Sequence, residues 1–252
     1  MSDTGRLVVV TGGAKGIGRA VAAAFAAGHD RVVVTGRDGP ALEEATRALG
    51  DVCVAGEVCD VTDERRVAEL FESLGEVDVL VNNAGVSTSA PLARTTLGDW
   101  RQQIEVNATG AFLCTRAALP GMVERDAGRI VMVASTAARI GYRYTAGYAA
   151  SKHAAVGLMR AVAAEVAGTG VTANAVCPAF VRTAMTARSV ERIVRETDRT
   201  AAEAERALAA ASPLGRLLEP EEVAEAVVYL ASPEAAAVNG QTLILDGGGI
   251  QA

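Results

Sequence analysis

Short runs of aliphatic, mostly β-branched residues recur along the chain, separated by longer segments rich in alanine and charge. Apolar and polar residues do not alternate inside these runs, which is typical of strands buried on both faces of a parallel sheet. The longer segments, such as GRAVAAAFAAG and EEVAEAVVYLAS, have the apolar spacing of helices. We expect strands at residues 7–11, 31–36, 51–58, 78–82, 129–135, 171–178 and 242–246.

The alternation of strand and helix predicts an α/β fold in which helices cover both faces of one parallel sheet. No linker, repeat or low-complexity segment divides the sequence, so we expect one domain over residues 1–252. Residues 183–212 interrupt the alternation, because they are rich in charge and alanine without a strand. We expect a helical segment outside the sheet, either a lid or a surface helix pair. The lid is favoured, since open α/β sheets bind ligands at the carboxyl ends of their strands.

Composition narrows the class of protein. Half of the 252 residues are hydrophobic but only 4% are aromatic, so the core must be aliphatic. The net charge of −6 is spread along the chain, and no basic run or basic amphipathic stretch indicates nucleic acid or a membrane as a partner. Without a signal-peptide pattern or a bilayer-spanning apolar run, we expect a soluble cytoplasmic protein. We also expect no metal site, since there are only two histidines, and buried reduced thiols at Cys53, Cys59, Cys114 and Cys177.

A glycine-rich segment, TGGAKGIG at residues 11–18, joins the first predicted strand to the first predicted helix. Gly12 can form a sharp turn, Gly16 lets the backbone approach a phosphate, and Gly18 permits close helix–strand packing. The helix N-terminus that follows favours an anion. An ordinary tight turn can have this composition, but its position after the first buried strand predicts dinucleotide binding. No GK[ST] sequence follows, which disfavours a nucleoside triphosphate.

Two cations mark the corner at which an adenosine ribose would lie. The second predicted strand ends VVVTGRD, so Gly36 stands where an NAD site carries an acid, and Arg37 follows. Lys15 lies within the glycine loop. Two cations without an acid at that position favour the 2′-phosphate of NADP(H) over NAD(H). In the alternative interpretation, Arg37 is a solvated loop charge and Asp38 binds the ribose.

The sequence YAASK places Tyr148 and Lys152 on one face of a predicted helix. A free phenol has a pKa of about 10, and a neighbouring ammonium group stabilises its anion. Lowering that pKa by about three units takes roughly 4 kcal/mol, more than an exposed ion pair supplies. We therefore expect Tyr148 to be an acid/base in a largely dehydrated site. The structural alternative is an ordinary buried ring beside a snorkelling lysine.

Two further polar residues fit the same chemistry. Ser135 ends a predicted strand at the carboxyl edge of the sheet, where its hydroxyl can orient a carbonyl oxygen for hydride attack. Asn107 lies in a helical pattern, and its amide can hold a water that links Lys152 to solvent. Individually, Ser135 could instead be a helix N-cap and Asn107 a plain helix residue.

These motifs resemble the short-chain dehydrogenase/reductase family. TGGAKGIG, NNAG at residues 82–85, Asn107, Ser135 and the pair Tyr148/Lys152 occur in the family's order, and the resemblance extends to LDGGG at 245–249. The sequence is most similar to ketoacyl and aromatic-polyketide ketoreductases and to hydroxyacyl dehydrogenases. The resemblance implies a single-domain, Rossmann-type doubly wound parallel sheet with strand order 3-2-1-4-5-6-7, an NAD(P) cofactor and a homotetramer.

The resemblance also implies individual roles. Asp60 and Val61 should lie at the adenine ring, and residues 83–85 along the adenosine ribose. Tyr148 and Lys152 should hold the nicotinamide ribose as well. The backbone of residue 181 and the hydroxyl of residue 183 should meet the carboxamide and phosphate region, although Ala179 replaces a glycine common in relatives. The expected cofactor-binding residues are Gly12, Lys15, Gly16, Ile17, Gly18, Arg37, Asp60, Val61, Asn83, Ala84, Gly85, Tyr148, Lys152, Val181 and Thr183.

Three functions are compatible with these residues. The first is an NADPH-dependent ketoreductase acting on a β-keto thioester, carried by a carrier protein or coenzyme A, or on a similar ketone. The second is a catabolic NAD(P)+-dependent alcohol or 3-hydroxyacyl dehydrogenase. The third is a non-catalytic dinucleotide-sensing regulator, which is disfavoured because Ser135, Tyr148 and Lys152 are all present. The loops at 87–97 and 139–146, which would face the substrate, carry the least pattern.

Overall fold

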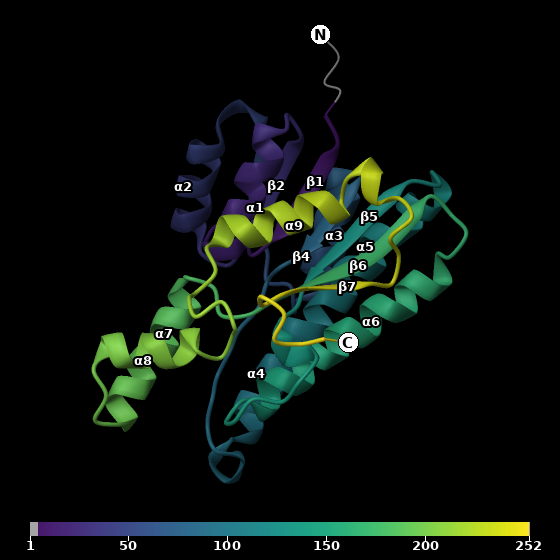
Figure 1. Cartoon of the computed structure of the whole chain (residues 1–252). Coiled ribbons are helices and arrows are strands. Elements are labelled where there is room, and N and C mark those ends of the chain that lie inside the picture. The colour runs from purple at the N-terminus through teal and green to yellow at the C-terminus, as the bar shows by residue number, and fades with distance from the viewer. Residues whose placement is uncertain (1–4, 252) are drawn as a thin grey trace.

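The computed structural model describes residues 5–251, except for the side chains of residues 52–54. A seven-stranded parallel sheet runs through the described chain in the order β3-β2-β1-β4-β5-β6-β7 (Figure 1). This confirms the predicted α/β class and strand order. Residues 1–4 and 252 of the predicted domain lie outside the described residues, so its limits of 1–252 stay a prediction.

Every predicted strand is present, with shifts at some ends. β5 stops at Val133 instead of 135, because the Ser135 hydroxyl accepts a hydrogen bond from the Ala137 N–H at 3.1 Å and opens a 3₁₀ turn. β3 begins at Cys53, after a 3₁₀ turn at Gly50–Val52. The strands are β1 Leu7–Thr11, β2 Arg31–Gly36, β3 Cys53–Val58, β4 Val79–Asn82, β5 Gly128–Val133, β6 Val171–Pro178 and β7 Thr242–Leu245.

Side-chain caps fix where several helices begin. Asp38 accepts from the Ala41 N–H before α2, and Asp63 accepts from the Arg66 N–H before α3. The helices are α1 Gly16–Ala27, α2 Gly39–Leu49, α3 Glu64–Leu74, α4 Leu97–Ile104, α5 Gly110–Glu124, α6 Ala146–Glu165, α7 Ala184–Glu196, α8 Ala201–Ala209 and α9 Pro220–Leu230. A π-helical turn, Glu105–Thr109, joins α4 to α5, and short 3₁₀ turns lie at Gly50–Val52, Leu92–Arg94, Thr136–Ala138 and Pro233–Ala235.

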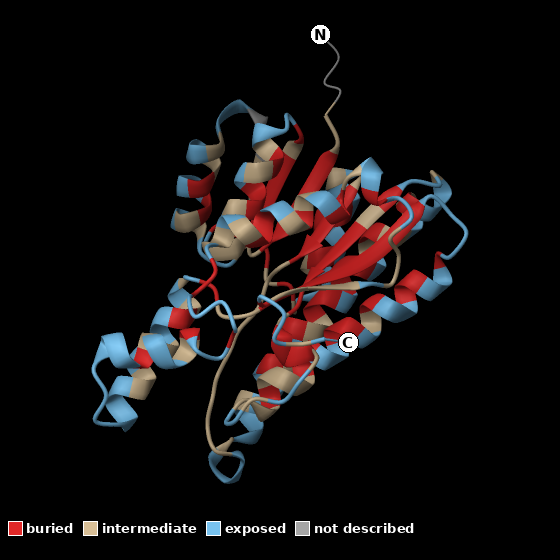
Figure 2. Cartoon of the chain, viewed as in Figure 1, coloured by how far each residue is buried: buried red, intermediate tan, exposed pale blue. Residues whose placement is uncertain are grey.

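The central strands of the sheet are buried on both faces, as the continuous apolar runs predicted (Figure 2). At the two edges of the sheet, β7 and the described side chains of β3 are half-buried or exposed, so that prediction was wrong for the edge strands. Successive residues of a strand point to opposite faces. Val8 and Val10 pack with Phe25 of α1 in the core beneath α1, α2 and α9. Val9 packs in the other core with Met122 of α5, beneath α3, α5 and α6. The carboxyl ends of the strands stay uncovered by these layers, and they position the site.

Helices α7 and α8 pack against each other outside the sheet, at the lower left of Figure 1. Within these two described helices the buried residues are Thr186, Ala204 and Ala209, and most other positions are exposed or half-buried (Figure 2). A helical segment at 183–212 is therefore confirmed. Its function as a lid stays a prediction.

Three cysteines, Cys59, Cys114 and Cys177, are buried and free, as predicted. The side chain of Cys53 lies outside the described part of the structure. Within residues 5–251, no helix combines the length and the apolar character needed to cross a lipid bilayer.

Candidate active site

The glycine loop lies between the carboxyl end of β1 and the start of α1. Gly12 and Gly16 have φ angles of 64° and 53°, in the left-handed region that side chains disfavour. A Cβ at Gly18 would collide with the carbonyl oxygen of Gly12, so the helix packs directly on the turn. The Lys15 side chain does not cap α1. The first N–H groups of α1 therefore have no side-chain acceptor there.

Asn83 fastens this loop to the end of β4. Its side-chain amide donates to the carbonyls of Thr11 and Gly12 at 2.9 and 3.1 Å. In return, Thr11 Oγ1 accepts from the backbone N–H groups of Asn83 and Ala84, each at 3.0 Å. Thr11 is not among the residues predicted for the site, although a threonine that ends a buried strand is the available signal. These bonds hold the two strand ends at a fixed separation.

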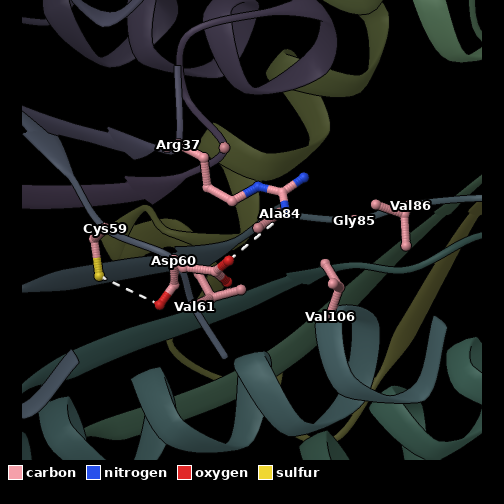
Figure 3. A pocket seen from close by; sticks show the side chains of 10 residues that line it. Arg37, Cys59, Asp60, Val61, Ala84, Gly85, Val86 and Val106 are labelled. Atoms are coloured by element: carbon pink, nitrogen blue, oxygen red, sulfur yellow. Dashed lines mark hydrogen bonds and ion pairs between the residues drawn. The ribbon is translucent and has the colours of Figure 1, made fainter. Parts of the chain in front are cut away.

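A pocket of ≈ 140 Å³ opens at this edge of the sheet (Figure 3). It brings together six of the predicted cofactor-binding residues that follow β2, β3 and β4 or precede α1. An added Cβ at Gly36 would meet nothing nearer than Leu42, at 3.8 Å, so the glycine leaves the end of β2 open. The lining residues are Gly12, Gly36, Arg37, Cys59, Asp60, Val61, Ala84, Gly85, Val86 and Val106.

Each of the two cations predicted to bind the cofactor contacts a carboxylate. Arg37 Nη1 is 3.6 Å from Asp60 Oδ2, the pair drawn in Figure 3. Lys15 Nζ is 2.5 Å from Asp38 Oδ2, and this hydrogen bond holds the pKa of Asp38 below its usual value. Burial opposes ionisation of Asp60, but hydrogen bonds from Thr62 and the charge of Arg37 keep its pKa low. Neither ion pair is predicted from the sequence.

The predicted catalytic residues meet where β5 and α6 approach each other. Tyr148 and Lys152 are one turn apart on α6, with Lys152 Nζ 5.9 Å from the centre of the tyrosine ring. Lys152 is only 5% exposed and donates a hydrogen bond to the Val133 carbonyl at 2.8 Å. Ser135, two residues after that carbonyl, lies near enough to Tyr148 for its hydroxyl to favour the phenolate form.

Burial dominates the proton equilibria of this group. It lowers the pKa of Lys152 to about 8, because the charged ammonium is removed from water. It raises the pKa of Tyr148, against the opposing effect of the hydrogen bond from Ser135. Lys152 was expected to lower the pKa of Tyr148. In the chain without a cofactor, burial outweighs any such effect, and the pKa of Tyr148 lies above the usual value for a phenol. Lowering of that pKa with the cofactor bound stays a prediction.

Asn107 lies in the π-helical turn, which replaces the regular helix expected from the sequence. Such turns are frequent at functional sites. The side-chain amide of Asn107 donates to the Val86 carbonyl and to Ser151 Oγ, and Asn107 Oδ1 accepts from the Val86 N–H. A Cβ at Gly85 would lie 3.2 Å from Asn107 Oδ1 and 3.6 Å from Lys152 Nζ. The two polar atoms therefore face one point above Gly85.

Ser151 is a residue that the sequence analysis missed. It is fully buried and donates to the Tyr148 carbonyl at 2.8 Å while accepting from Asn107. The sequence YAASK contains it, and its position one helical turn after Tyr148 was the available signal. Ser151 thereby links the amide on the π-helical turn to the helix that carries Tyr148.

The segment before α7 closes the glycine loop from another side. A Cβ at Gly16 would lie 3.3 Å from Thr183 Cγ2, and Thr183 caps α7. The Val181 carbonyl accepts from Thr186 Oγ1 at 2.6 Å. Ala179 continues the pairing of β6 by donating to the Leu245 carbonyl. Ile17 is partly buried against the core beneath α1.

Comparisons with known proteins agree with this arrangement. A family model described as "Enoyl-(Acyl carrier protein) reductase" matches residues 12–249. A putative ketoacyl reductase of Streptomyces coelicolor is 40% identical over 250 residues, covering 96% of each chain. The 3-oxoacyl-[acyl-carrier-protein] reductase FabG of Vibrio cholerae is 36% identical over 252 residues, covering 98% of each. A crystal structure of a substituted actinorhodin polyketide ketoreductase with NADPH has a TM-score of 0.93, at 38% identity and 98% coverage of each chain.

The fold and the matched sequences together define an oxidoreductase that acts on C=O or CH–OH groups. Within that class, the chain belongs to the short-chain dehydrogenase/reductase family, as the motifs in the sequence indicated.

Proposed function

We propose that the protein is an NADPH-dependent ketoreductase that reduces a β-keto thioester or a similar ketone, with Tyr148 as the proton donor. The observation that carries the proposal is the meeting of Ser135, Tyr148 and Lys152 beside a glycine loop with two cations. Relatives described as ketoacyl reductases support the substrate class, and the similar structure with NADPH supports the cofactor.

The residues around the glycine loop fit a phosphorylated dinucleotide. Positive φ angles at Gly12 and Gly16, and α1 N–H groups without a side-chain cap, suit a pyrophosphate. Lys15 and Arg37 would bind the 2′-phosphate, which supplies a better acceptor than the carboxylates beside them.

The other proposed cofactor contacts are made by residues that line the pocket or lie beside it. Asp60 and Val61 line its adenine end, and Ala84 and Gly85 its wall along β4, with Asn83 supporting them. Thr183 Cγ2 and Cβ lie beside Gly16, and we propose that the Val181 N–H and the Thr183 hydroxyl bind the carboxamide and phosphates there. When bound, NADPH supplies the hydride.

The Ser135 hydroxyl lies near enough to Tyr148 to affect its pKa, so a ketone oxygen placed between the two hydroxyls would accept from both. Two donors polarise the carbonyl and stabilise the negative charge that develops on its oxygen. At neutral pH the phenol is protonated and can donate its proton to the ketone oxygen, and the same group can act as the base in the reverse direction.

Lys152 is suited to return the proton to Tyr148. With a pKa of about 8, its ammonium form predominates at neutral pH but gives up a proton more readily than an exposed lysine. Lys152 Nζ and Asn107 Oδ1 face one point above Gly85, where a water molecule would connect them. Asn107 would hold that water, and Val86 and Ser151 fix the orientation of its amide.

The decisive test is Tyr148→Phe, which removes the proposed donor and keeps the ring. Turnover of a β-keto thioester with NADPH should fall at least about a hundredfold, the usual effect of removing a general acid. NADPH affinity, measured by fluorescence titration, should change less than about twofold, since one hydroxyl among many cofactor contacts is lost. A variant that keeps a near-normal rate would exclude the acid role.

The acyl group is proposed to arrive on a carrier protein or coenzyme A, because relatives are described as 3-oxoacyl-[acyl-carrier-protein] reductases. Comparing kcat/KM for the carrier-bound, coenzyme A and free forms of one β-keto acid tests this. The homotetramer stays a prediction, which analytical ultracentrifugation of the purified protein checks.

A further inference from the structure

Gln103 is a buried amide that the proposed chemistry does not use. It lies near the end of α4 and is only 1% exposed. A buried amide is costly unless its donors and acceptor are satisfied. Gln103 Oε1 accepts from the backbone N–H of Thr88 at 3.0 Å, and Nε2 donates to the Asp99 carbonyl at 3.2 Å. One of its two partners thus lies on the loop that follows β4.

Asn107 binds the same loop four residues further along the chain. It contacts both backbone groups of Val86, whereas Gln103 contacts the N–H of Thr88. Two side-chain amides from consecutive turns therefore fasten residues 86–88 to the segment formed by α4 and the π-helical turn. The loop continues to Ala90, whose N–H donates to the Tyr144 carbonyl at 2.9 Å. Residues 86–90 are therefore hydrogen-bonded to two segments, the one that carries Gln103 and Asn107 and the loop that carries Tyr144.

Gln103 also supports the first turn of α6. A Cβ at Gly147 would lie 2.7 Å from Gln103 Nε2 and 3.6 Å from the Cα of Trp100. Gly147 is buried, and its φ is not in the left-handed region, so its backbone would accept a side chain. The glycine is needed because the amide occupies the space. Tyr148 is the next residue, so its helix begins directly on Gln103.

We propose that Gln103 is a positioning residue that sets the separation between the loop at 86–88 and Tyr148. The inference rests on the proposed function, because the ketone would lie between these two elements. Gln103 acts through Thr88 on one side and Gly147 on the other, and it touches neither the ketone nor the cofactor. Its loss should change how the ketone is held more than how NADPH is bound.

The first test is Gln103→Leu, which keeps most of the volume and removes both hydrogen bonds. The KM for the ketone should rise about tenfold, the factor that one such hydrogen bond is worth, while kcat falls much less. NADPH affinity should stay unchanged. The matched control is Gln102→Leu on the exposed side of α4, which should leave both constants as they are.

A second readout does not depend on turnover. Hydrogen exchange at the Thr88 amide should be about tenfold faster in Gln103→Leu than in the unsubstituted protein or in Gln102→Leu, because that N–H loses its acceptor. If Gln103→Leu does not fold, Gln103→Met provides the same comparison. Unchanged exchange at Thr88 together with an unchanged KM would overturn the proposal.

The contact with Gly147 is tested by a double-mutant cycle. Gly147→Ala alone should lower kcat/KM and the melting temperature, since its Cβ meets the Gln103 amide. Adding Gln103→Ala should restore part of both losses, whereas additive losses would contradict the contact. If the unsubstituted protein reduced no ketone, the proposed function would fail, but exchange at Thr88 and the melting temperatures would still decide the role of Gln103.

Discussion

Lys15 and Lys152 lie at the two ends of the proposed cofactor site, in opposite surroundings. The Lys15 side chain is 66% exposed, and its ammonium contacts the Asp38 carboxylate. Lys152 is 5% exposed, and its ammonium donates to a backbone carbonyl, with no carboxylate ion pair found for it within the described chain. Lys15 therefore offers a charge to an anion from solvent. Lys152 holds its proton less firmly, because burial lowers its pKa to about 8.

This difference shows that a lysine in a motif can have either of two functions, and that its surroundings decide which. An exposed cation with a weak partner can exchange that partner for a phosphate at little cost. A buried cation without a counter-charge is close to losing its proton, which suits proton transfer. Three experiments can break or sharpen the comparison.

The largest effect is expected at exposed Lys15 and its neighbour Arg37. Replacing both cations, Lys15→Gln with Arg37→Gln, should lower kcat/KM for NADPH about a hundredfold, since each charge-assisted bond to a phosphate is worth roughly 1.5–3 kcal/mol before screening by solvent. NADH has no 2′-phosphate, so its kcat/KM should change less than about threefold. Initial rates with both cofactors measure this. Equal losses of kcat/KM for NADPH and NADH would mean that the two cations do not bind the 2′-phosphate.

Buried Lys152 should make the stability of the protein depend on pH. The pKa of Lys152 falls from 10.5 in the unfolded chain to about 8 in the folded one. Between these values the unfolded state binds more protons, so stability rises with pH as folded Lys152 becomes neutral. Relative to Lys152→Met, the free energy of unfolding of the unsubstituted protein should rise by about 2 kcal/mol from pH 7.5 to 9.5, and stay level below pH 7.

Urea unfolding of the two proteins without cofactor measures that difference, and Lys15→Met provides the matched control. An exposed ion pair contributes about 0–1 kcal/mol, so this control should differ little from the unsubstituted protein over the same pH range. A flat difference for Lys152→Met would show that the buried ammonium is stabilised by more than its bond to Val133.

Much of the site could be predicted because its signals are local. Buried parallel strands have continuous apolar runs, and the spacing of Tyr148 and Lys152 is that of one helical turn. The resemblance to the family supplied the strand order. The pairs Lys15–Asp38 and Arg37–Asp60 join residues far apart in the sequence, so they depend on how the strand ends come together. The raised pKa of Tyr148 likewise depends on burial, which spacing along a helix does not reveal.

The loop after β4 was the least predictable part, for a related reason. Its conformation is set by amides that α4 and the π-helical turn direct toward it, Gln103 and Asn107. A helical pattern identifies such residues as members of a helix. It does not distinguish a buried amide with a backbone partner from one that faces solvent, as Gln102 does.

The smallest effect is expected from Asp38→Asn, which separates the two interpretations of the ribose corner. Asparagine keeps the cap on the Ala41 N–H but removes the charge that holds Lys15. If Lys15 binds the 2′-phosphate, the KM for NADPH should fall about twofold to threefold, and the gain should shrink as salt is added. If Asp38 instead binds the ribose hydroxyls of NADH, the KM for NADH should rise without a gain for NADPH. The melting temperature should hardly change, whereas Asp38→Ala, which loses the cap as well, should cost about 1 kcal/mol of stability.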